Sequence, residues 1–423
     1  MVVEGFTGFF RSQLNALVDL HVGGAPTLDG GPATLTIRDD GIVFGAATRI
    51  RSAGTVTLES GRFSVNTLQI DPGGTFDWQG GRFRIENLSI GSAQVLGSAL
   101  TIDAARELEV VNQLTVEPSG TLNLDGGLII AGAVDMSGIF NWTTGTFQIT
   151  EDLAIETSNG FGADLAMSGS QSLLVDKALR VGAAGAGVVS VDGSAAVAAI
   201  NTTVGGTAAG DGSITVSGGG TSLNTAVSLT VADAGTANVT IEDGAHLNSQ
   251  FAAVGKQANA DGTVTLQGGG SLWNVITNVS NQTTMPIGGA GKGTVNIGAG
   301  SMMVMDFTDA VLGEMTDGDG TVNVSGPNAT WQFLNQPADT LTVGHDGTGL
   351  MNVNSGGTVI SGKGFVACRS GSTGVVNVDG PDSSWHPLFL EVGGDGERGA
   401  WRHPWPSLPD RPQAERASRR LVA

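Results

Sequence analysis

The sequence is short of several residue types, and each shortage excludes a class of protein. Cys368 is the only cysteine, so no intramolecular disulfide framework can form. No apolar run reaches the roughly 18 residues that a membrane-spanning helix needs. Residues 1–20 lack a basic start followed by an apolar run, so they are not typical of a signal peptide. Only 14% of the residues are charged.

Basic residues are also scarce. The chain has 20 Lys and Arg against 40 Asp and Glu, which gives a net charge of −20. Such a surface repels phosphate backbones, so we expect no nucleic-acid partner.

The last residues differ, because six arginines and four prolines crowd 397–423. We expect a basic tail there, disordered or produced by a frameshift, and a chain that is a fragment or a damaged reading frame.

The sequence contains internal repeats. One pattern, seen as Thr321-Val-Asn-Val-Ser-Gly-Pro, starts at residues 213, 263, 321 and 375, and a related pattern starts between them at 188, 238, 294 and 350. The step of 25 to 31 residues is typical of repeat proteins. In the first half, Val56–Leu58, Phe63 and Leu68–Ile70 return after 20 residues. We therefore expect the repeat type to change near residue 180.

Each repeat has the pattern of short strands. Val322 and Val324 flank a single Asn, which places both valines on one face of a strand. A typical unit has three such bursts, Val322/Val324, Trp331/Phe333 and Leu341/Val343, separated by turn-forming residues. Three strands per coil, stacked on the next coil, predict a right-handed parallel β-helix. A β-propeller or β-sandwich is the alternative, but propeller blades need about 40 residues.

This fold implies four segments. We expect an N-terminal segment or cap at 1–33, short coils of about 20 residues at 34–180, and longer repeats of about 25 to 30 residues at 181–396. The basic tail at 397–423 follows.

The second half also resembles a known family. The pattern Val-Gly-x-x-Gly-x-Gly, found at Leu341–Gly349 and in part at Leu390–Gly396, combines with Gly326-Pro-Asn-Ala-Thr-Trp331. Together they are similar to the repeat of autotransporter (type V secretion) passengers and PEP-CTERM exported proteins, over about residues 179–396. The resemblance implies a monomeric β-helix on the outer-membrane surface or outside the cell, with no catalytic residues and no cofactor. A translocator or anchor is expected but absent from this chain.

Two columns of repeated residues suggest ligands. Trp273, Trp331 and Trp385 share one repeat position, which Leu223 also occupies. They could stack on sugar rings, although the aliphatic alternates favour core packing. Asp211, Asp261 and Asp319 share another position, and with Asp317 and Asp346 they could bind calcium between coils. Asp before Gly is also common in turns, and we favour turns over a metal site.

The remaining candidates concern catalysis and anion binding. We expect a non-catalytic structural or adhesive segment whose partners are host or surface glycans or proteins. The alternative is a carbohydrate-active enzyme, a lyase or hydrolase, on the same scaffold. The histidines, at 21, 246, 345, 386 and 403, do not share a column. Arg62 and Arg82 are predicted to stack on adjacent coils, where they could bind an acidic glycan; a solvated face with nearby acids is favoured.

Overall fold

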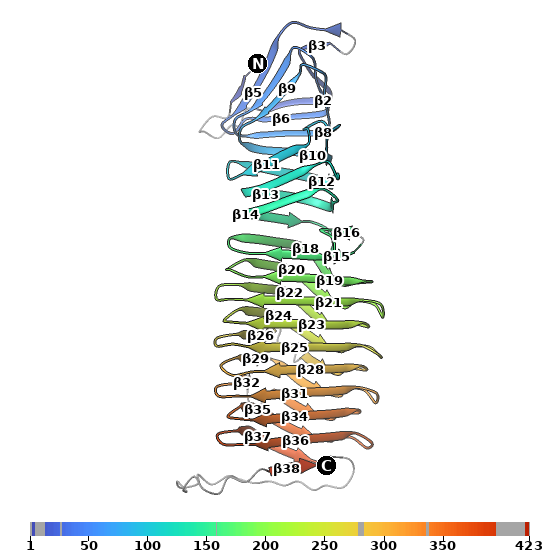
Figure 1. Ribbon diagram of the computed structural model, residues 1–423, viewed down its shortest axis with the longest axis vertical. Helices are drawn as coiled ribbons and strands as arrows, with labels where there is room; N and C mark the ends of the chain where they lie inside the picture. The colour runs from blue at the N-terminus through green and yellow to red at the C-terminus, as the bar shows by residue number, and fades with distance from the viewer. Residues whose placement is uncertain are drawn as a thin grey trace. The chain divides into compact units, whose positions relative to one another are not determined.

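The chain is built from β-strands. The computed structural model describes residues 2–4, 13–25, 28–157, 159–277, 283–335, 338–394 and 419–422, and these residues contain no helix. They form two compact units. Unit 1 comprises Met1–Leu153, Asn159–Phe161 and Ser170–Asp176, and unit 2 comprises Ala154–Ser158, Gly162–Gly169 and Lys177–Ala423. Each unit is a stack of parallel coils (Figure 1), so the predicted β-solenoid fold is confirmed.

The first side of unit 2 is a parallel sheet without register shifts. The strands that start the predicted repeats pair directly: Val188 with Ser213, and so on to Leu350 with Val375. The repeat alignment read from the sequence is therefore the strand register. The strands are β17 (Asp164–Met167), β19 (Ala186–Val191), β21 (Asp211–Ser217), β23 (Thr236–Glu242), β25 (Asp261–Gln267), β28 (Lys292–Ile297), β31 (Asp319–Ser325), β34 (Thr348–Asn354) and β36 (Thr373–Asp379).

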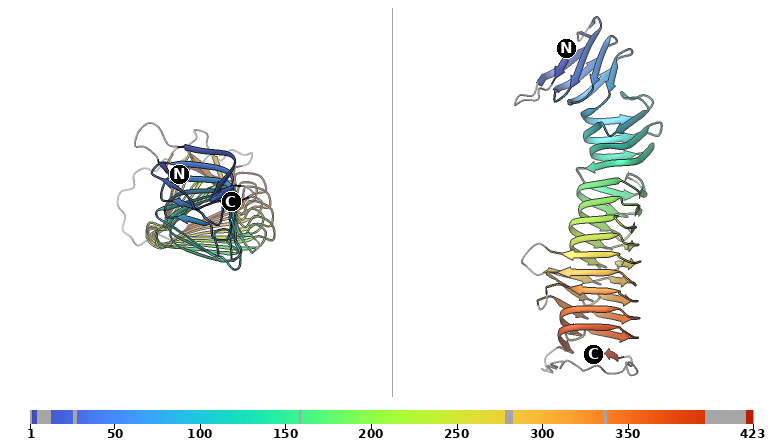
Figure 2. Two further views of the ribbon diagram at one scale, coloured as in Figure 1. Left: turned by 90° about the horizontal axis from the view of Figure 1, so that it is seen from above. Right: turned by 90° about the vertical axis from the view of Figure 1, so that its left-hand side faces the viewer.

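The second and third sides of unit 2 are joined in most coils. One long strand runs along both sides and changes register where it bends, as at Thr225/Ser228. Figure 2 shows these coils from the side, each strand beside its counterpart in the next coil. The long strands are β20 (Ala196–Val204), β22 (Ser222–Val231), β24 (His246–Val254), β35 (Thr358–Val366) and β37 (Ser384–Val392). In the other coils the two sides are separate strands: β26 (Leu272–Ile276) and β27 (Thr283–Ile287), β29 (Met302–Asp306) and β30 (Thr308–Leu312), β32 (Thr330–Phe333) and β33 (Thr340–Val343).

The core of unit 2 runs along the inside of the stack. Val324 from β31, Trp331 from β32 and Leu341 from β33 are each fully buried. This confirms three inward-facing strands in this coil. Burial of one such side chain stabilises the fold by about 1.5 to 3 kcal/mol. Because one coil has no partner for this apolar surface, the coils are stable only when stacked.

The glycines of the Val-Gly-x-x-Gly-x-Gly pattern follow from the tight turn between coils. Gly344 has a φ of +76°, a left-handed conformation that costs little only for glycine. Gly349 is the second residue of the next strand, β34, and a Cβ added there would overlap the backbone nitrogen of Gly344. The pattern therefore marks the place where the third side of one coil turns into the first side of the next.

Outward-facing asparagines tie neighbouring coils together. On the first side of unit 2, the side-chain amides of Asn323, Asn352 and Asn377 each donate a hydrogen bond of 2.8 Å to the asparagine of the preceding coil. Stacking in register places identical side chains above one another, so Asn323 and Asn352 each donate to the preceding asparagine and accept from the following one. These hydrogen bonds fix the strand register on the outward, polar face, and the buried valines of the same strands fix it on the inward face.

The chain end and the N-terminal segment both contribute strands. β38 (Arg419–Val422) pairs antiparallel with β36. The rest of the predicted tail at 397–423 lies outside the described residues. In the predicted N-terminal segment at 1–33, β2 (Gln13–Val22) pairs parallel with β6 (Ile42–Ile50) as part of the stack of unit 1.

Unit 1 has coils of unequal length. Ile42 pairs with Arg62 and Arg62 with Arg82, each 20 residues on, as predicted. Arg82 pairs with Glu107, a longer step, because an extra turn at 91–98 precedes β11 (Ala99–Asp103). The other main strands are β5 (Ala33–Arg38), β7 (Gly54–Leu58), β8 (Arg62–Ile70), β9 (Thr75–Trp78), β10 (Gly81–Ile90), β12 (Arg106–Val116), β13 (Thr121–Met136), β14 (Ile139–Ile149) and β18 (Gln171–Val181), of which only Gln171–Asp176 belong to this unit.

A repeated sequence in unit 1 builds the same aromatic cluster twice. In the first copy Phe76 and Trp78 pack on Phe83, with ring centroids 5.0 and 5.5 Å away. In both copies the indole N–H donates to a glycine carbonyl three residues on, at 3.3 Å. The same aromatic residues at the same spacing therefore produce the same local structure twice. The second copy consists of Phe140, Trp142 and Phe147.

Candidate functional site

The tryptophan column lies inside the stack. Trp273 and Trp331 are fully buried, and Trp385 is half-buried. Each indole N–H donates to a side chain of the preceding coil, which satisfies the polar atom inside the core. Trp273 and Trp331 are therefore core residues, the interpretation that the sequence favoured, and their rings are not accessible to a sugar. The acceptors are Ser249 Oγ (3.2 Å), Met305 Sδ (3.2 Å) and Ser361 Oγ (3.0 Å).

The aspartate column does not form a metal site. Asp211, Asp261 and Asp319 share one register position on the first side, but they lie two coils apart. Thr236 and Lys292 occupy the coils between them. The ammonium of Lys292 lies 3.5 Å from a carboxylate oxygen of Asp261. Within the described residues no group of three or more His, Cys, Asp or Glu side chains is spaced for a metal ion.

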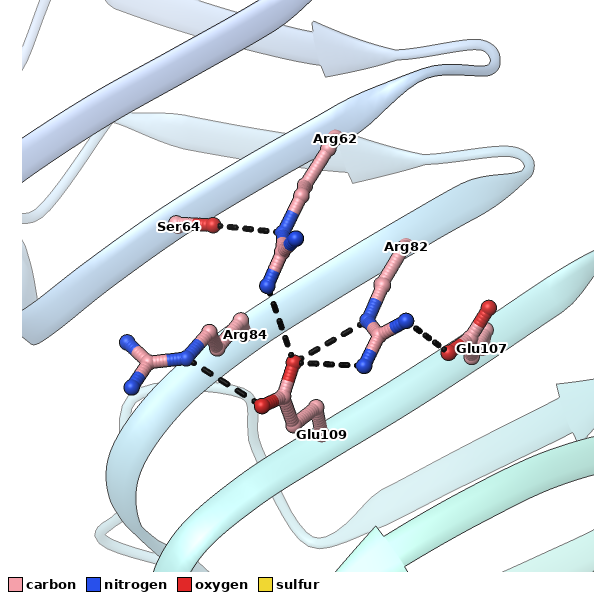
Figure 3. Close-up of polar contacts among 6 residues, drawn as sticks. All are labelled: Arg62, Ser64, Arg82, Arg84, Glu107 and Glu109. Atoms are coloured by element: carbon pink, nitrogen blue, oxygen red, sulfur yellow. Dashed lines mark hydrogen bonds and ion pairs between the residues drawn. The ribbon is translucent and has the colours of Figure 1, made fainter. Parts of the chain in front are cut away.

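The predicted arginine pair is part of a larger ionic network in unit 1 (Figure 3). Arg62 and Arg82 are register partners on β8 and β10. Both contact Glu109 of β12, at 3.2 and 2.8 Å, and Arg84 contacts the same carboxylate at 3.2 Å. Arg82 also reaches Glu107 at 2.8 Å. The network joins three successive coils, and acidic residues lie beside the arginines as predicted.

His345 and Cys368 lie on neighbouring coils and contact backbone carbonyl groups. His345 Nδ1 lies 3.1 Å from the carbonyl oxygen of Glu314 and 3.2 Å from Asp346. The Cys368 thiol faces the carbonyl oxygen of His345 at 4.0 Å. Burial raises the pKa of this thiol, which favours the unreactive protonated form. His403 lies outside the described residues.

One corner of unit 2 differs from the regular coils. In β22, β24 and β35 only one or two residues separate the second side from the third. In three successive coils this connection is longer and comprises 276–283, 306–308 and 334–339. We call the described residues of these connections, with the flanking Asp309 and Thr340, the insertion corner; they are Ile276, Thr277, Thr283, Asp306, Phe307, Thr308, Asp309, Leu334, Asn335, Ala338, Asp339 and Thr340. In solenoids, insertions that fall on one face often form the binding surface.

The insertion corner exposes large apolar side chains. Phe307 is 39% exposed and Leu334 is 50% exposed. Phe307 has a φ of +53°, which is a strained conformation for a bulky residue. Its carbonyl oxygen accepts hydrogen bonds from the backbone N–H of Thr283 (3.1 Å) and from the hydroxyl of Thr277 (3.2 Å) in the preceding coil. These contacts hold the backbone of Phe307 in the strained conformation at the surface.

The same corner contains a buried carboxyl group. The Asp339 side chain is fully buried, and its Oδ2 accepts a hydrogen bond of 3.1 Å from the backbone N–H of Asn335. Among the described residues, its Oδ1 has no hydrogen-bond partner. Burial, and to a lesser degree the charges of Asp306 and Asp309, raise the pKa of Asp339 to about 6. Asp309 is itself engaged, because its Oδ1 accepts the backbone N–H of Thr340 at 2.6 Å.

Sequence reasoning did not find the insertion corner, although a signal was present. The repeat starts at 263, 294, 321 and 350 are more widely spaced than the constant 25-residue step before and after them. The three long steps are consecutive, so their extra residues lie on neighbouring coils. The sequence does not show at which corner of the coil those residues leave the stack.

No family model matches the chain, and no solved structure matches it. A stretch of 122 residues, 28% of this chain, is 34% identical to the uncharacterized lipoprotein YdeK of Escherichia coli (strain K12). The match spans 9% of that protein's length.

Proposed function

We propose that this chain is a non-catalytic structural and adhesive segment of an exported bacterial surface protein, and that the insertion corner is its contact surface. The observation that carries this proposal is the lengthening of three successive coils at one corner, which gathers exposed Phe307 and Leu334 there. A regular solenoid needs no such residues for its own stability. Exposed large apolar side chains that gather on one surface are typical of interaction sites.

The proposed location at the cell surface has two supports. The second-half repeat resembles those of autotransporter passengers and PEP-CTERM exported proteins. Part of the chain is also similar to a protein described as a lipoprotein, which hints at the cell envelope. A net charge of −20 suits an exterior that stays soluble and does not self-associate.

The composition of the insertion corner indicates the kind of partner. Its described residues include Asp306 and Asp309 beside the apolar side chains, and exposed Lys363 of the next coil pairs with Thr340 at its border, so the two carboxylates outnumber the one ammonium group. Charge complementarity therefore favours a protein surface with an apolar anchor surrounded by basic residues. Aromatic anchors such as Phe307 contribute most to such interfaces.

The proposal can be tested by display on bacteria that lack other adhesins. Cells that display the chain should be retained on surfaces coated with extracellular-matrix proteins. The double variant Phe307→Ser/Leu334→Ser should abolish this retention. Met315→Ser is the matched control, because Met315 is 54% exposed on the loop between β30 and β31, away from the corner. Equal retention by parent and double variant would contradict the assignment of the corner.

A carbohydrate-active enzyme on this scaffold is the second candidate. It is favoured by the raised pKa of Asp339 beside Asp306 and Asp309, since a glycosidase uses two carboxyl groups of different pKa. Against it, Asp339 is fully buried, so its carboxyl group does not reach a substrate. Release of reducing ends or unsaturated sugars from a panel of polysaccharides, lost in Asp339→Asn, would favour the enzyme over the adhesive segment.

A further inference from the structure

The arginine network of unit 1 contains unused hydrogen-bond donors. Arg82 directs Nε, Nη1 and Nη2 to Glu107 and Glu109. Arg84 uses only Nε, and Figure 3 shows its two terminal nitrogens directed away from Glu109. Arg62 uses Nε and Nη2, so its Nη1 is also without a partner among the described residues. An arginine fork of two parallel N–H groups suits a planar carboxylate.

The network is positively charged within an acidic chain. Three arginines face two glutamates, which leaves one positive charge where the whole chain has a net charge of −20. The Arg62 and Arg84 side chains remain 35% and 28% exposed, so a ligand can reach them. Because Glu109 is held by three guanidinium groups, the forks are fixed in position before a ligand arrives, which reduces the entropy lost on binding.

An aromatic ring lies in the same column as Arg84. Phe44 pairs with Ser64, and Ser64 pairs with Arg84, so the three side chains face outward on successive coils. Two coil steps separate Phe44 from Arg84 by about 10 Å. Phe44 is half-buried, whereas the small Ser64 between them is buried and its hydroxyl accepts a hydrogen bond from Arg62 Nε at 3.1 Å. The column therefore offers a ring surface at one end and a guanidinium fork at the other.

We propose that this column binds a carboxylated polysaccharide, such as a uronate polymer. The Arg84 fork and Arg62 Nη1 bind the sugar carboxylate, and Phe44 packs against the ring of a neighbouring sugar. An acidic protein would use the arginines but would not need Phe44 at this distance, which favours the saccharide. The site lies in unit 1 and does not depend on the insertion corner.

Calorimetric titration of the full chain tests the proposal. The probes are polygalacturonate, its methyl ester, dextran sulfate and poly-glutamate. The parent should bind polygalacturonate more tightly than the other three. Arg84→Gln should weaken this binding roughly tenfold or more, the cost expected for a lost charge-assisted hydrogen bond. Arg84→Lys should also weaken it, because the charge remains but the fork is lost.

Two further variants separate the site from general charge effects. Arg369→Gln is the matched control, since Arg369 is an exposed arginine of unit 2 paired with Asp346 at 3.0 Å, and it should bind as the parent does. Phe44→Ala should weaken binding of polygalacturonate and leave binding of poly-glutamate unaffected.

The proposal is overturned if the parent does not bind polygalacturonate, if Arg84→Gln binds it as tightly as the parent, or if poly-glutamate or dextran sulfate binds the parent equally well. Because Glu109 keeps its contacts to Arg62 and Arg82 in Arg84→Gln, the variant should fold, and an unchanged melting temperature checks this.

Discussion

Replacing Asp339 by Asn should remove a pH-dependent loss of stability from unit 2. The Asp339 side chain is fully buried, and within the part of the chain that the structure describes only one of its two oxygens has a hydrogen-bond partner. An ionised carboxylate in this position is costly, which is why burial raises its pKa from 3.8 to about 6. The amide of the variant keeps an oxygen that can accept the Asn335 N–H and has no charge to desolvate.

The raised pKa fixes both the sign and the size of the effect. Below about pH 3.8 the carboxyl is protonated in the folded and unfolded chain, so it causes no penalty. As the pH rises from about 3.8 to about 6, the unfolded chain loses its proton more readily, and the folded state loses stability. A pKa difference of this size corresponds to about 3 kcal/mol, fully developed above pH 6. The amide in Asp339→Asn does not titrate, so the variant should escape this loss.

The measurement is urea unfolding of parent and Asp339→Asn at about pH 4 and about pH 7.5. The stability of the variant relative to the parent should rise by up to about 3 kcal/mol between the two pH values. Any cost of the new amide is the same at both values and cancels in this comparison. Asp317→Asn, at an exposed aspartate of the same unit, is the control and should show no such change.

A relative stability of Asp339→Asn that is independent of pH would refute the reasoning. It would mean that the carboxyl is solvated or paired in the folded protein, and that the corner is more open than its burial indicates. A larger change in Asp317→Asn than in Asp339→Asn would point instead to the overall negative charge as the cause.

Three further predictions concern the core and the cysteine. Val324→Asp places a charge at a fully buried inward position and should lower the free energy of unfolding by several kcal/mol; a melting temperature equal to that of the parent would contradict the inward assignment. Trp331→Ala should cost about 3 to 5 kcal/mol in chemical denaturation, because it removes a buried ring and its N–H contact to Met305, whereas Trp385→Ala, at a half-buried ring, should cost less. Cys368 should react with iodoacetamide at neutral pH more slowly than a free thiol of ordinary pKa, because burial raises its pKa; rapid alkylation of the folded chain would argue against that burial.

Much of the fold follows from the sequence because a solenoid repeats its local rules. The starts at 188, 213 and 238 pair directly in the structure, since one inward valine pattern per coil allows only one register. The repeated Phe-x-Trp pattern likewise builds the same cluster at Trp78 and Trp142. Burial of the tryptophan column was predictable because other coils have aliphatic side chains at the same position. A position that takes either kind of large apolar side chain is typical of the interior.

The tertiary structure decided which side chains meet across coils. The sequence places Arg62 and Arg82 together, but not the carboxylate of Glu109, because the step from β10 to β12 is not the 20-residue step. The repeat period gives the position of a residue along its own coil. The side chains that the residue contacts depend also on which coil is stacked next to it.

The insertion corner shows the same limit most clearly. The lengthened steps after residues 263, 294 and 321 are visible in the sequence, yet three corners of each coil were available to take the extra residues. Only the strand pairing places them at one corner, where Phe307 and Leu334 are exposed while Asp339 is buried. The repeated sequence determines the stack because each coil packs in the same way as its neighbour. Where the inserted residues lie is determined only once the neighbouring coils are stacked.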